Sequence, residues 1–200
     1  MMTTDSLSPT LVTRTTRETE VTVGLDSATP GLKVAVPLFG HFLDACLTTW
    51  GHPVSVEARG DTDVDPHHLV EDVGIVLGRA LAKHWPGYRN VARYGWAVVA
   101  MDDARAEVAL DLSGRAGSFL DQVPEGPVNG LDSEVLREFW HGLARGGELT
   151  VQLNIPAGQN RHHRWEAAFK ALGLALRQAT MIRDGTLSTK GVIGRAGGDC

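Results

Sequence analysis

The pattern His-His-x-x-Glu occurs twice in this chain, at residues 67–71 and again at residues 162–166. These two copies hold four of the eight histidines. Neutral imidazole together with carboxylate is a ligand set that suits Mn, Fe, Zn or Ni. A single histidine pair is more often a plain helix start, but the repetition of the whole pattern favours a metal site. The predicted ligands are His67, His68, Glu71, His162, His163 and Glu166.

The spacing inside each copy determines how a metal ion can be held. On a helix, Glu71 follows His67 by four positions and His68 by three, so its carboxylate can share a face with either imidazole. The two adjacent imidazoles, however, point about 100° apart around the helix axis. One copy therefore cannot easily direct both at one ion. We expect the two copies to face each other and to hold two ions, each bound by side chains from both copies.

Length and composition narrow the class of protein. Two hundred residues suffice for one domain or two small halves. Asp and Glu number 24 against 19 Lys and Arg, without a long basic run, which argues against nucleic acid as a partner. No apolar stretch approaches the roughly 20 residues that span a bilayer, so no membrane partner is expected. Residues 1–13 lack the features of a signal peptide and predict a disordered lead. Cys46 and Cys200 provide no disulfide framework, and we expect a cytoplasmic protein.

Hydrophobic periodicity predicts the same order of elements in both halves of the chain. In the first half, strands are predicted at residues 20–25, 32–37 and 54–58, and helices at residues 42–50 and about 66–83. In the second half, strands are predicted at residues 96–100, 106–112 and 149–155, and helices at residues 133–144 and 162–180. His162 follows His67 by 95 positions. The matched order indicates a duplication.

The predicted fold class is α+β, with two duplicated half-domains. Each half is expected to be a small, mostly antiparallel sheet with helices on one face, so that the two His-His-x-x-Glu helices are symmetry mates. The halves are predicted at residues 14–88 and 89–193, followed by a flexible tail at residues 194–200.

The chain resembles the imidazole glycerol phosphate dehydratase family over residues 14–193. The segments that carry the resemblance, highly specific as a set, are residues 14–19, 60–61, 65–72, 101–103, 110–115, 158–163, 166–170 and 188–191. The resemblance implies a metal-dependent hydro-lyase of histidine biosynthesis that converts imidazole glycerol phosphate to imidazole acetol phosphate. It also implies two Mn²⁺ ions and a homo-oligomer, a 24-mer, with active sites built at subunit interfaces.

The same resemblance assigns roles to individual residues. One ion would take His67, His162 and Glu166, and the other His68, Glu71 and His163. The catalytic carboxylates would be Glu18, which serves acid/base work against the substrate, together with Glu71 and Glu166. The positions that bind the substrate phosphate would be Arg93, Arg115, Lys170, Ser188 and Lys190. On the sequence alone, the two arginines could equally be surface ion-pair residues, and Ser-Thr-Lys-Gly a plain turn.

The chain departs from the family pattern at the metal ligands. Ala45 and Gln152 stand where the family has ligand histidines, and Thr49 stands where it has a glutamine near the substrate. Two histidines and one carboxylate then remain for each ion, which is still a recognised set for an open metal site. The sequence leaves open whether His41, Cys46 or Gln152 replaces a missing ligand.

Three functions are compatible with these observations. The chain is a working dehydratase with adapted ligands, a repurposed lyase or isomerase that acts on a different phosphorylated substrate in specialised metabolism, or a catalytically silent, metal-poor homologue. A silent protein is expected to bind little metal. A repurposed enzyme is expected to bind metal and to leave imidazole glycerol phosphate unchanged.

Overall fold

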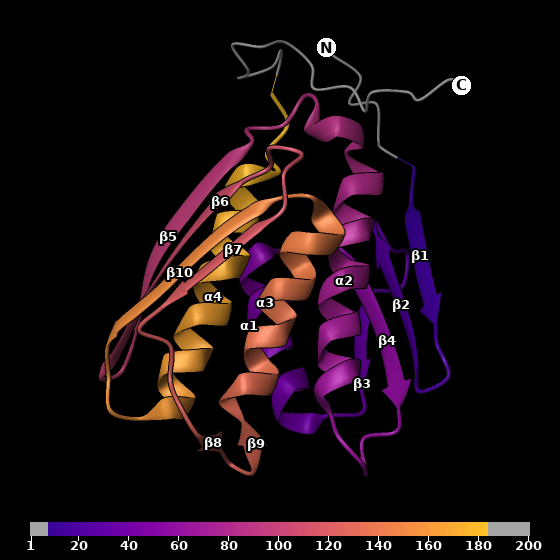
Figure 1. Ribbon diagram of the computed structural model, residues 1–200. Helices are drawn as coiled ribbons and strands as arrows, with labels where there is room; N and C mark the ends of the chain where they lie inside the picture. The colour runs from indigo at the N-terminus through magenta and orange to yellow at the C-terminus, as the bar shows by residue number, and fades with distance from the viewer. Residues whose placement is uncertain (1–7, 184–200) are drawn as a thin grey trace.

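The computed structural model describes residues 8–183, which form two four-stranded sheets with a layer of helices between them (Figure 1). The first sheet has the strand order β1-β2-β4-β3. Its strands β1, β2 and β4 are antiparallel neighbours, and β3 runs parallel to β4. The bounds are β1 Thr10–Thr15, β2 Thr19–Leu25, β3 Gly31–Val34 and β4 Val54–Gly60.

The second sheet repeats the first. Its strand order is β5-β6-β10-β7, with β5, β6 and β10 antiparallel and β7 parallel to β10. The bounds are β5 Tyr94–Met101, β6 Ala104–Asp111, β7 Gly117–Asp121 and β10 Thr150–Ala157, with a small hairpin of β8 Pro127–Val128 and β9 Leu131–Asp132. Apart from this hairpin, each half follows the order β-β-β-α-β-α. The predicted duplicated half-domains are confirmed.

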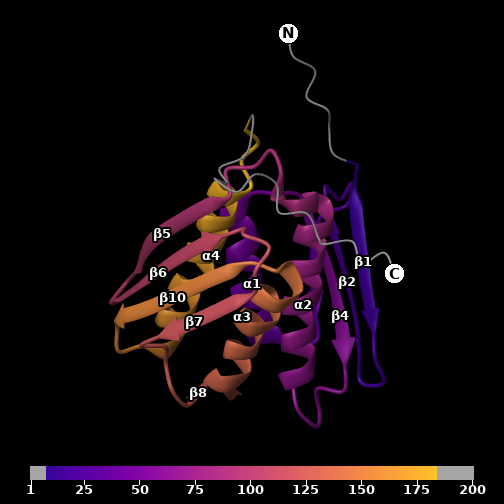
Figure 2. The ribbon, with the colours of Figure 1, turned by 45° about the horizontal axis from the view of Figure 1, so that its top comes forward.

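The helices connect the two halves through their packing. Helix α2 lies on the first sheet and α4 on the second, while α3 packs against α2 and α1 against α4 (Figure 2). The shorter helix of each half therefore packs against the long helix of the other half. The bounds are α1 Pro37–Trp50, α2 His67–His84, α3 Ser133–Gly147 and α4 Arg161–Ala179, with a 3-10 turn η1 at Pro86–Tyr88.

Aromatic side chains fill the centre of the helix layer. Phe139 of α3 packs against Phe39 of α1 at a ring-centroid distance of 5.5 Å and against Phe169 of α4 at 5.1 Å. All three rings are fully buried. Burying one such side chain contributes about 1.5–3 kcal/mol, so the helices of the two halves share one core.

The predicted elements are present with shifted ends, and some strands were missed. Residues 10–13, placed in a disordered lead by the sequence analysis, form the start of β1, which pairs with β2. That prediction is wrong for these residues. They are ordered by pairing with β2, and Thr10 is buried where its hydroxyl hydrogen-bonds to His84, contacts that the local sequence does not show. Strand β7 at the sheet edge and the β8–β9 hairpin were also missed. The predicted tail at residues 194–200 lies outside the described residues.

Within residues 8–183, no helix is both long enough and apolar enough to cross a bilayer. The boundary predicted at residues 88 and 89 falls at the end of η1, and it stays a prediction.

Candidate metal and substrate site

The two His-His-x-x-Glu copies lie at or next to the starts of α2 and α4, at the same end of the molecule (Figure 1). Polar caps fix both starts. The Asn160 side-chain oxygen accepts from the backbone N–H of His162 at 2.9 Å and of His163 at 3.4 Å. The Asp65 carboxylate accepts from the backbone N–H of His67 at 2.8 Å. These caps satisfy N–H groups that a helix start leaves unpaired, and they hold the imidazoles in the first turn.

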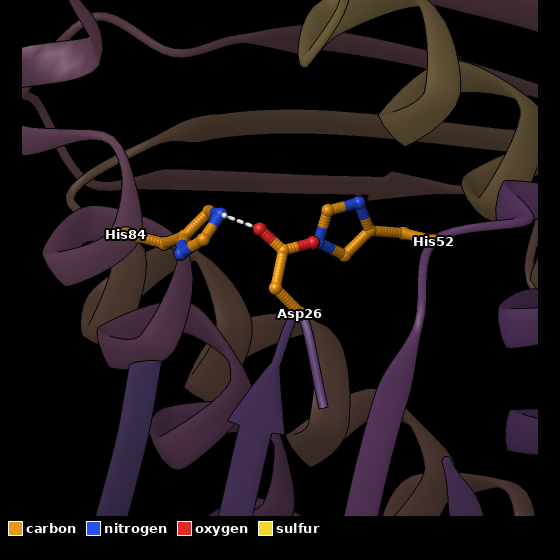
Figure 3. Close-up of side chains that lie close together, drawn as sticks. All are labelled: Asp26, His52 and His84. Carbon is orange, nitrogen blue, oxygen red and sulfur yellow. Dashed lines mark ion pairs between the residues drawn. The ribbon is translucent and has the colours of Figure 1, made fainter. Parts of the chain in front are cut away.

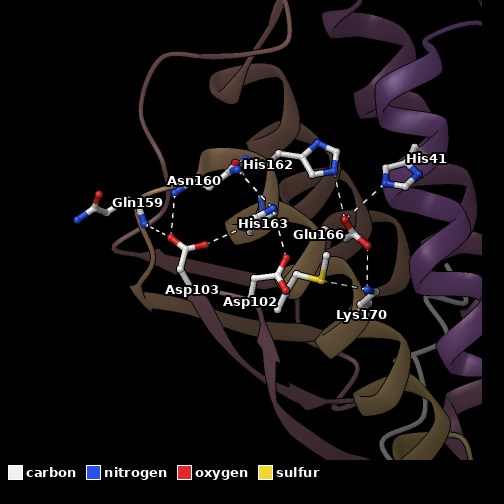
Figure 4. Close-up of polar contacts among 10 residues, drawn as sticks. His41, Asp102, Asp103, Gln159, Asn160, His162, His163, Glu166 and Lys170 are labelled. Carbon is white, nitrogen blue, oxygen red and sulfur yellow. Dashed lines mark hydrogen bonds and ion pairs between the residues drawn. The ribbon is translucent and has the colours of Figure 1, made fainter.

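The second copy forms a cluster with a histidine from α1 (Figure 4). His162 Nε2 lies 3.2 Å from Glu166 Oε2, and His41 Nε2 lies 3.6 Å from the same oxygen. The two imidazole rings stack at a centroid distance of 5.3 Å. One ligand atom from each of these three residues lies within 4.8 Å of the others. The cluster is therefore able to hold a metal ion.

His41 brings its imidazole to the helix face that also carries Ala45. The two residues are four positions apart on α1, so they share a face one helical turn apart. Cys46, the other replacement that the sequence left open, is fully buried in the core. Burial raises the pKa of its thiol, which disfavours the thiolate form that binds metal ions.

The contact of His41 with Glu166 depends on how closely α1 and α4 approach. A Cβ atom at Gly173 would lie 2.1 Å from the Cys46 carbonyl oxygen, so the crossing admits no side chain there. Thr49 Oγ1 lies 2.9 Å from the Ala45 carbonyl oxygen and 3.1 Å from the Lys170 carbonyl oxygen. Thr49 thus contributes to this helix contact.

Glu166 is held as a carboxylate at the centre of the cluster. Its Oε1 pairs with Lys170 Nζ at 2.8 Å, while Oε2 faces the imidazoles of His41 and His162. Burial alone would raise the pKa of Glu166, but the hydrogen bond and charge of Lys170, with a smaller contribution from His41, lower it overall. The buried Nδ1 of His162 has no hydrogen-bond partner among the described residues. An anionic oxygen beside two imidazoles fits a divalent cation.

His163 points away from this cluster, as the divergence of adjacent helical side chains predicts. Its Nδ1 lies 2.8 Å from Asp103 Oδ1, and its Nε2 lies 3.5 Å from Asp102 Oδ2. Asp103 also accepts from the backbone N–H groups of Gln159 at 2.6 Å and Asn160 at 3.2 Å. The hydrogen bond with His163, followed by those two N–H groups, lowers the pKa of Asp103 to about 2.

Asp102 and Asp103 were not among the predicted site residues, although their segment carries part of the family resemblance. They form the turn between β5 and β6, where Asp102 has a φ of 48°. The sequence signal that could have identified them is a pair of aspartates in a tight turn between two strands of alternating apolar and polar residues. The turn places carboxylates that orient the imidazole of a predicted ligand, as is common around metal sites.

The first copy makes different contacts. His68 Nδ1 lies 2.6 Å from Glu18 Oε2, so the predicted acid/base residue adjoins a predicted ligand. Glu71 pairs instead with Arg145 of α3 at 2.5 Å. His67 packs edge-on against His68 at a ring-centroid distance of 5.4 Å.

The two copies do not come together within one chain, contrary to the expectation that they face each other. Helices α2 and α4 lie on opposite sheets, and α1 and α3 lie between them (Figures 1 and 2). Over residues 8–183, the groups of three close ligand atoms do not include His67, His68 or Glu71. The site of one chain is incomplete with respect to the predicted six-residue set.

The predicted phosphate-binding residues fall into two places. Arg93 makes two contacts with Asp111, at 2.7 and 3.2 Å, and Arg115 lies 4.0 Å from the same carboxylate. This is the ion-pair arrangement that the sequence allowed as an alternative. Lys170 lies instead beside Glu166. Ser188 and Lys190 lie outside the described residues.

Gln152 lies on β10, on the face of the second sheet turned away from the helices. It is opposite Ala109 of β6 and Phe119 of β7 in the strand register, and Phe119 is exposed. Its neighbours in the chain, Val151 and Leu153, are buried on the helix side. Gln152 therefore points away from the helix layer that holds His41 and Glu166.

Comparisons with known proteins agree with this architecture. A sequence model of the imidazoleglycerol-phosphate dehydratase family matches residues 34–176. The imidazoleglycerol-phosphate dehydratase of Desulforudis audaxviator is 45% identical over 188 residues, which cover 91% of this chain and 96% of that protein. The enzyme of the same name from Lacticaseibacillus casei is 40% identical, with 91% and 97% covered.

Two solved structures of imidazoleglycerol-phosphate dehydratases also match this chain. A crystal structure of IGPD from Pyrococcus furiosus matches with a TM-score of 0.83 and 37% identity, covering 91% of this chain and 100% of that one. The imidazoleglycerol-phosphate dehydratase of Staphylococcus aureus matches with a TM-score of 0.76 and 26% identity, covering 86% and 99%. The chain therefore belongs to the imidazoleglycerol-phosphate dehydratase family.

Proposed function

We propose that this protein is a metal-dependent hydro-lyase that dehydrates imidazole glycerol phosphate to imidazole acetol phosphate in histidine biosynthesis. Membership of the family supports this activity, since relatives at 40–45% identity over 91% of the chain carry the name of that enzyme. The observation that carries the proposal is the cluster of His41, His162 and Glu166. It offers two imidazoles and a carboxylate to one ion. Because the chain has no disulfide framework, we infer the cytoplasm as its location.

The metal would be bound by His41, His162 and Glu166, with Lys170 keeping the carboxylate ionised. Manganese is the ion that the family resemblance implies, and the same donor set also suits Fe, Zn or Ni. A divalent cation supplies Lewis-acid stabilisation for negative charge that develops on the substrate's imidazole ring. Asp102 and Asp103 would hold His163 in a fixed orientation toward the second ion's position.

Proton transfer is assigned to Glu18. Dehydration requires a group that removes a proton from carbon, and a carboxylate within reach of the substrate performs this role. Glu18 is exposed and lies at the edge of the first copy, next to His68. Its position lets it meet a substrate whose imidazole is bound by the neighbouring ligands. Arg115, exposed beside Asp111, is the candidate for the substrate phosphate.

The complete site would form between copies of the chain. One chain keeps the two His-His-x-x-Glu copies apart, so a set drawn from both requires a second subunit. The outer face of the second sheet carries the exposed apolar side chains of Trp96, Val98 and Phe119 beside Gln152. A surface of this kind suits contact with another subunit. We infer a homo-oligomer, and the resemblance implies a 24-mer.

A second candidate function rests on the two replaced ligands. Ala45 and Gln152 stand where the family has histidines, so the surroundings of the substrate's ring differ from the family pattern. A repurposed enzyme that acts on a different phosphorylated substrate would retain the metal and the phosphate-binding residues and change this region.

The experiment that separates the two candidates is an assay of purified protein reconstituted with Mn²⁺, which follows imidazole acetol phosphate formation. Turnover that a chelator abolishes and Mn²⁺ restores supports the dehydratase. Metal-loaded protein that binds inorganic phosphate but leaves imidazole glycerol phosphate unchanged supports the second candidate. Protein that takes up no metal contradicts both.

A further inference from the structure

A second group of histidines lies at the other end of the helix layer. Asp26 directly follows β2, and His84 is the last residue of α2 (Figure 3). His52 lies just before β4 and is separated from it by one proline. These positions are opposite the helix starts that carry the His-His-x-x-Glu copies (Figure 1). All three residues come from the first half of the chain, from segments that are far apart in sequence.

Both imidazoles contact the carboxylate of Asp26, each through a different oxygen. His52 Nε2 lies 3.2 Å from Asp26 Oδ1, and His84 Nε2 lies 3.2 Å from Asp26 Oδ2. In a tetrahedral zinc site with bonds of about 2.0–2.1 Å, neighbouring ligand atoms are about 3.3 Å apart. One ligand atom from each of the three residues lies within 4.8 Å of the others. Small side-chain rotations therefore close the set on one ion.

The nitrogen atoms that face Asp26 are buried, and each makes an ion-pair contact with its carboxylate. His84 has only 1% of its side chain exposed, and His52 has 19%. Neither Nε2 has a well-aligned hydrogen-bond partner among residues 8–183, despite the short distances to the carboxylate. Buried nitrogen atoms without such a partner are costly, and a bound cation would satisfy both.

The other contacts of His84 and His52 are those of metal-binding imidazoles. His84 Nδ1 hydrogen-bonds to Thr10 Oγ1 at 2.9 Å, which leaves the Nε2 lone pair for an ion when Nδ1 carries the proton. His52 stacks on Trp50 at 4.9 Å, and Trp85 packs edge-on against His84 at 4.5 Å.

We propose that Asp26, His52 and His84 form a divalent-metal site in addition to the candidate active site, with zinc as the preferred ion. Two imidazole nitrogens and one carboxylate oxygen occupy three positions of a tetrahedron, and a water molecule takes the fourth. The site ties the end of β2, the start of β4 and the end of α2 together. Since these segments meet only in the folded chain, bound zinc stabilises the fold.

The test compares zinc content in wild-type protein, His52→Gln and His141→Gln. Each purified full-length protein is stripped with a chelator, equilibrated with zinc at a fixed free concentration, and analysed for zinc per chain. His52→Gln removes a ligand at a partly exposed position, whereas His141→Gln removes a histidine outside both clusters. We expect His52→Gln to hold about one zinc ion fewer per chain than the other two proteins. Equal zinc content in all three overturns the proposal.

A second comparison keeps the proposal testable if His52→Gln folds poorly. Asp26→Asn keeps the side-chain shape and removes the anionic ligand. Zinc should raise the melting temperature of wild-type protein by several degrees and that of Asp26→Asn by much less. In wild-type protein with Co²⁺, the site should give the visible absorption of a four-coordinate ion, and Asp26→Asn should lose that component. An equal zinc-induced shift in both proteins overturns the proposal. Turnover is expected to be the same in wild-type protein and His52→Gln when both are loaded with Mn²⁺.

Discussion

The imidazole of His41 lies 3.6 Å from the carboxylate of Glu166, where α1 crosses α4. His41 stands one helical turn before Ala45, where the resemblance to the family implied a ligand histidine. The two positions share a helix face, so an imidazole at either can meet the start of α4. This relationship explains how the chain retains a set of two imidazoles and a carboxylate.

The first prediction concerns the metal affinity of this cluster. His41→Ala should weaken Mn²⁺ binding by at least about tenfold, because it removes one of three ligands and the loss of a mere hydrogen-bond partner of a ligand already costs about 10–100-fold. Adding Ala45→His to that variant should restore part of the affinity, since an imidazole returns to the same helix face. Calorimetric titration of stripped protein measures both effects. Thr48→Ala, at an exposed position of α1, is the control. Unchanged affinity in His41→Ala would show that His41 is not a ligand.

The second prediction concerns Glu18 as the acid/base residue. Glu18→Gln should lower kcat by about 10²–10⁴-fold, because the amide cannot accept the proton. Metal content should not change, since Glu18 is not a predicted ligand. Steady-state kinetics together with metal analysis measures the two quantities. Glu20→Gln, which only breaks a surface ion pair with Arg59, should keep its activity. A Glu18→Gln protein with normal kcat contradicts the assignment.

The third prediction concerns the close approach of α1 and α4. Gly173→Ala places a Cβ atom 2.1 Å from the Cys46 carbonyl oxygen, so the helices must separate. We expect a loss of about 1–3 kcal/mol in unfolding free energy, together with weaker metal binding because His41 moves with α1. Gly31→Ala is the matched control, since its Cβ meets no atom within 4 Å. Denaturant unfolding of both variants measures the difference, and equal stability would contradict this account of the crossing.

The fourth prediction concerns pH. The pKa of Asp103 is lowered from 3.8 to about 2, so the folded state favours its ionised form. This contribution to stability is fully present above pH of about 4 and is lost as the pH falls toward about 2. Wild-type protein should therefore lose more stability between pH 5 and pH 3 than Asp103→Asn, whose side chain does not titrate. Urea unfolding at the two pH values measures this. An identical loss in both proteins would show that Asp103 is not held ionised by His163 and the backbone.

Much of the fold could be predicted because it depends on local patterns. Hydrophobic alternation and helical spacing located the long helices at the two His-His-x-x-Glu copies, and their matched order indicated the duplication. The start of β1 was missed because Thr10 is buried by a contact with His84 from the far end of α2. Strand β7 was missed because it is a short edge strand. Its own residues do not indicate that it pairs with β10.

The site was harder to predict because its contacts join distant segments. Spacing identified the two histidine pairs. Spacing could not show that His41 meets Glu166, since that depends on the crossing of α1 and α4 at Gly173. It also could not show that Glu71 pairs with Arg145, which depends on the packing of α2 against α3. Asp26, His52 and His84 are unremarkable singly, and only the tertiary structure brings them together.

His41 is proposed to bind the metal of the active site together with His162 and Glu166. The most direct measurement is the rate of imidazole acetol phosphate formation by Mn²⁺-loaded wild-type protein and by His41→Ala at the same metal concentration. We expect chelator-sensitive turnover in the wild-type protein and a rate at least about tenfold lower in His41→Ala at limiting Mn²⁺. Equal rates in the two proteins, or no turnover by metal-loaded wild-type protein, would contradict this proposal.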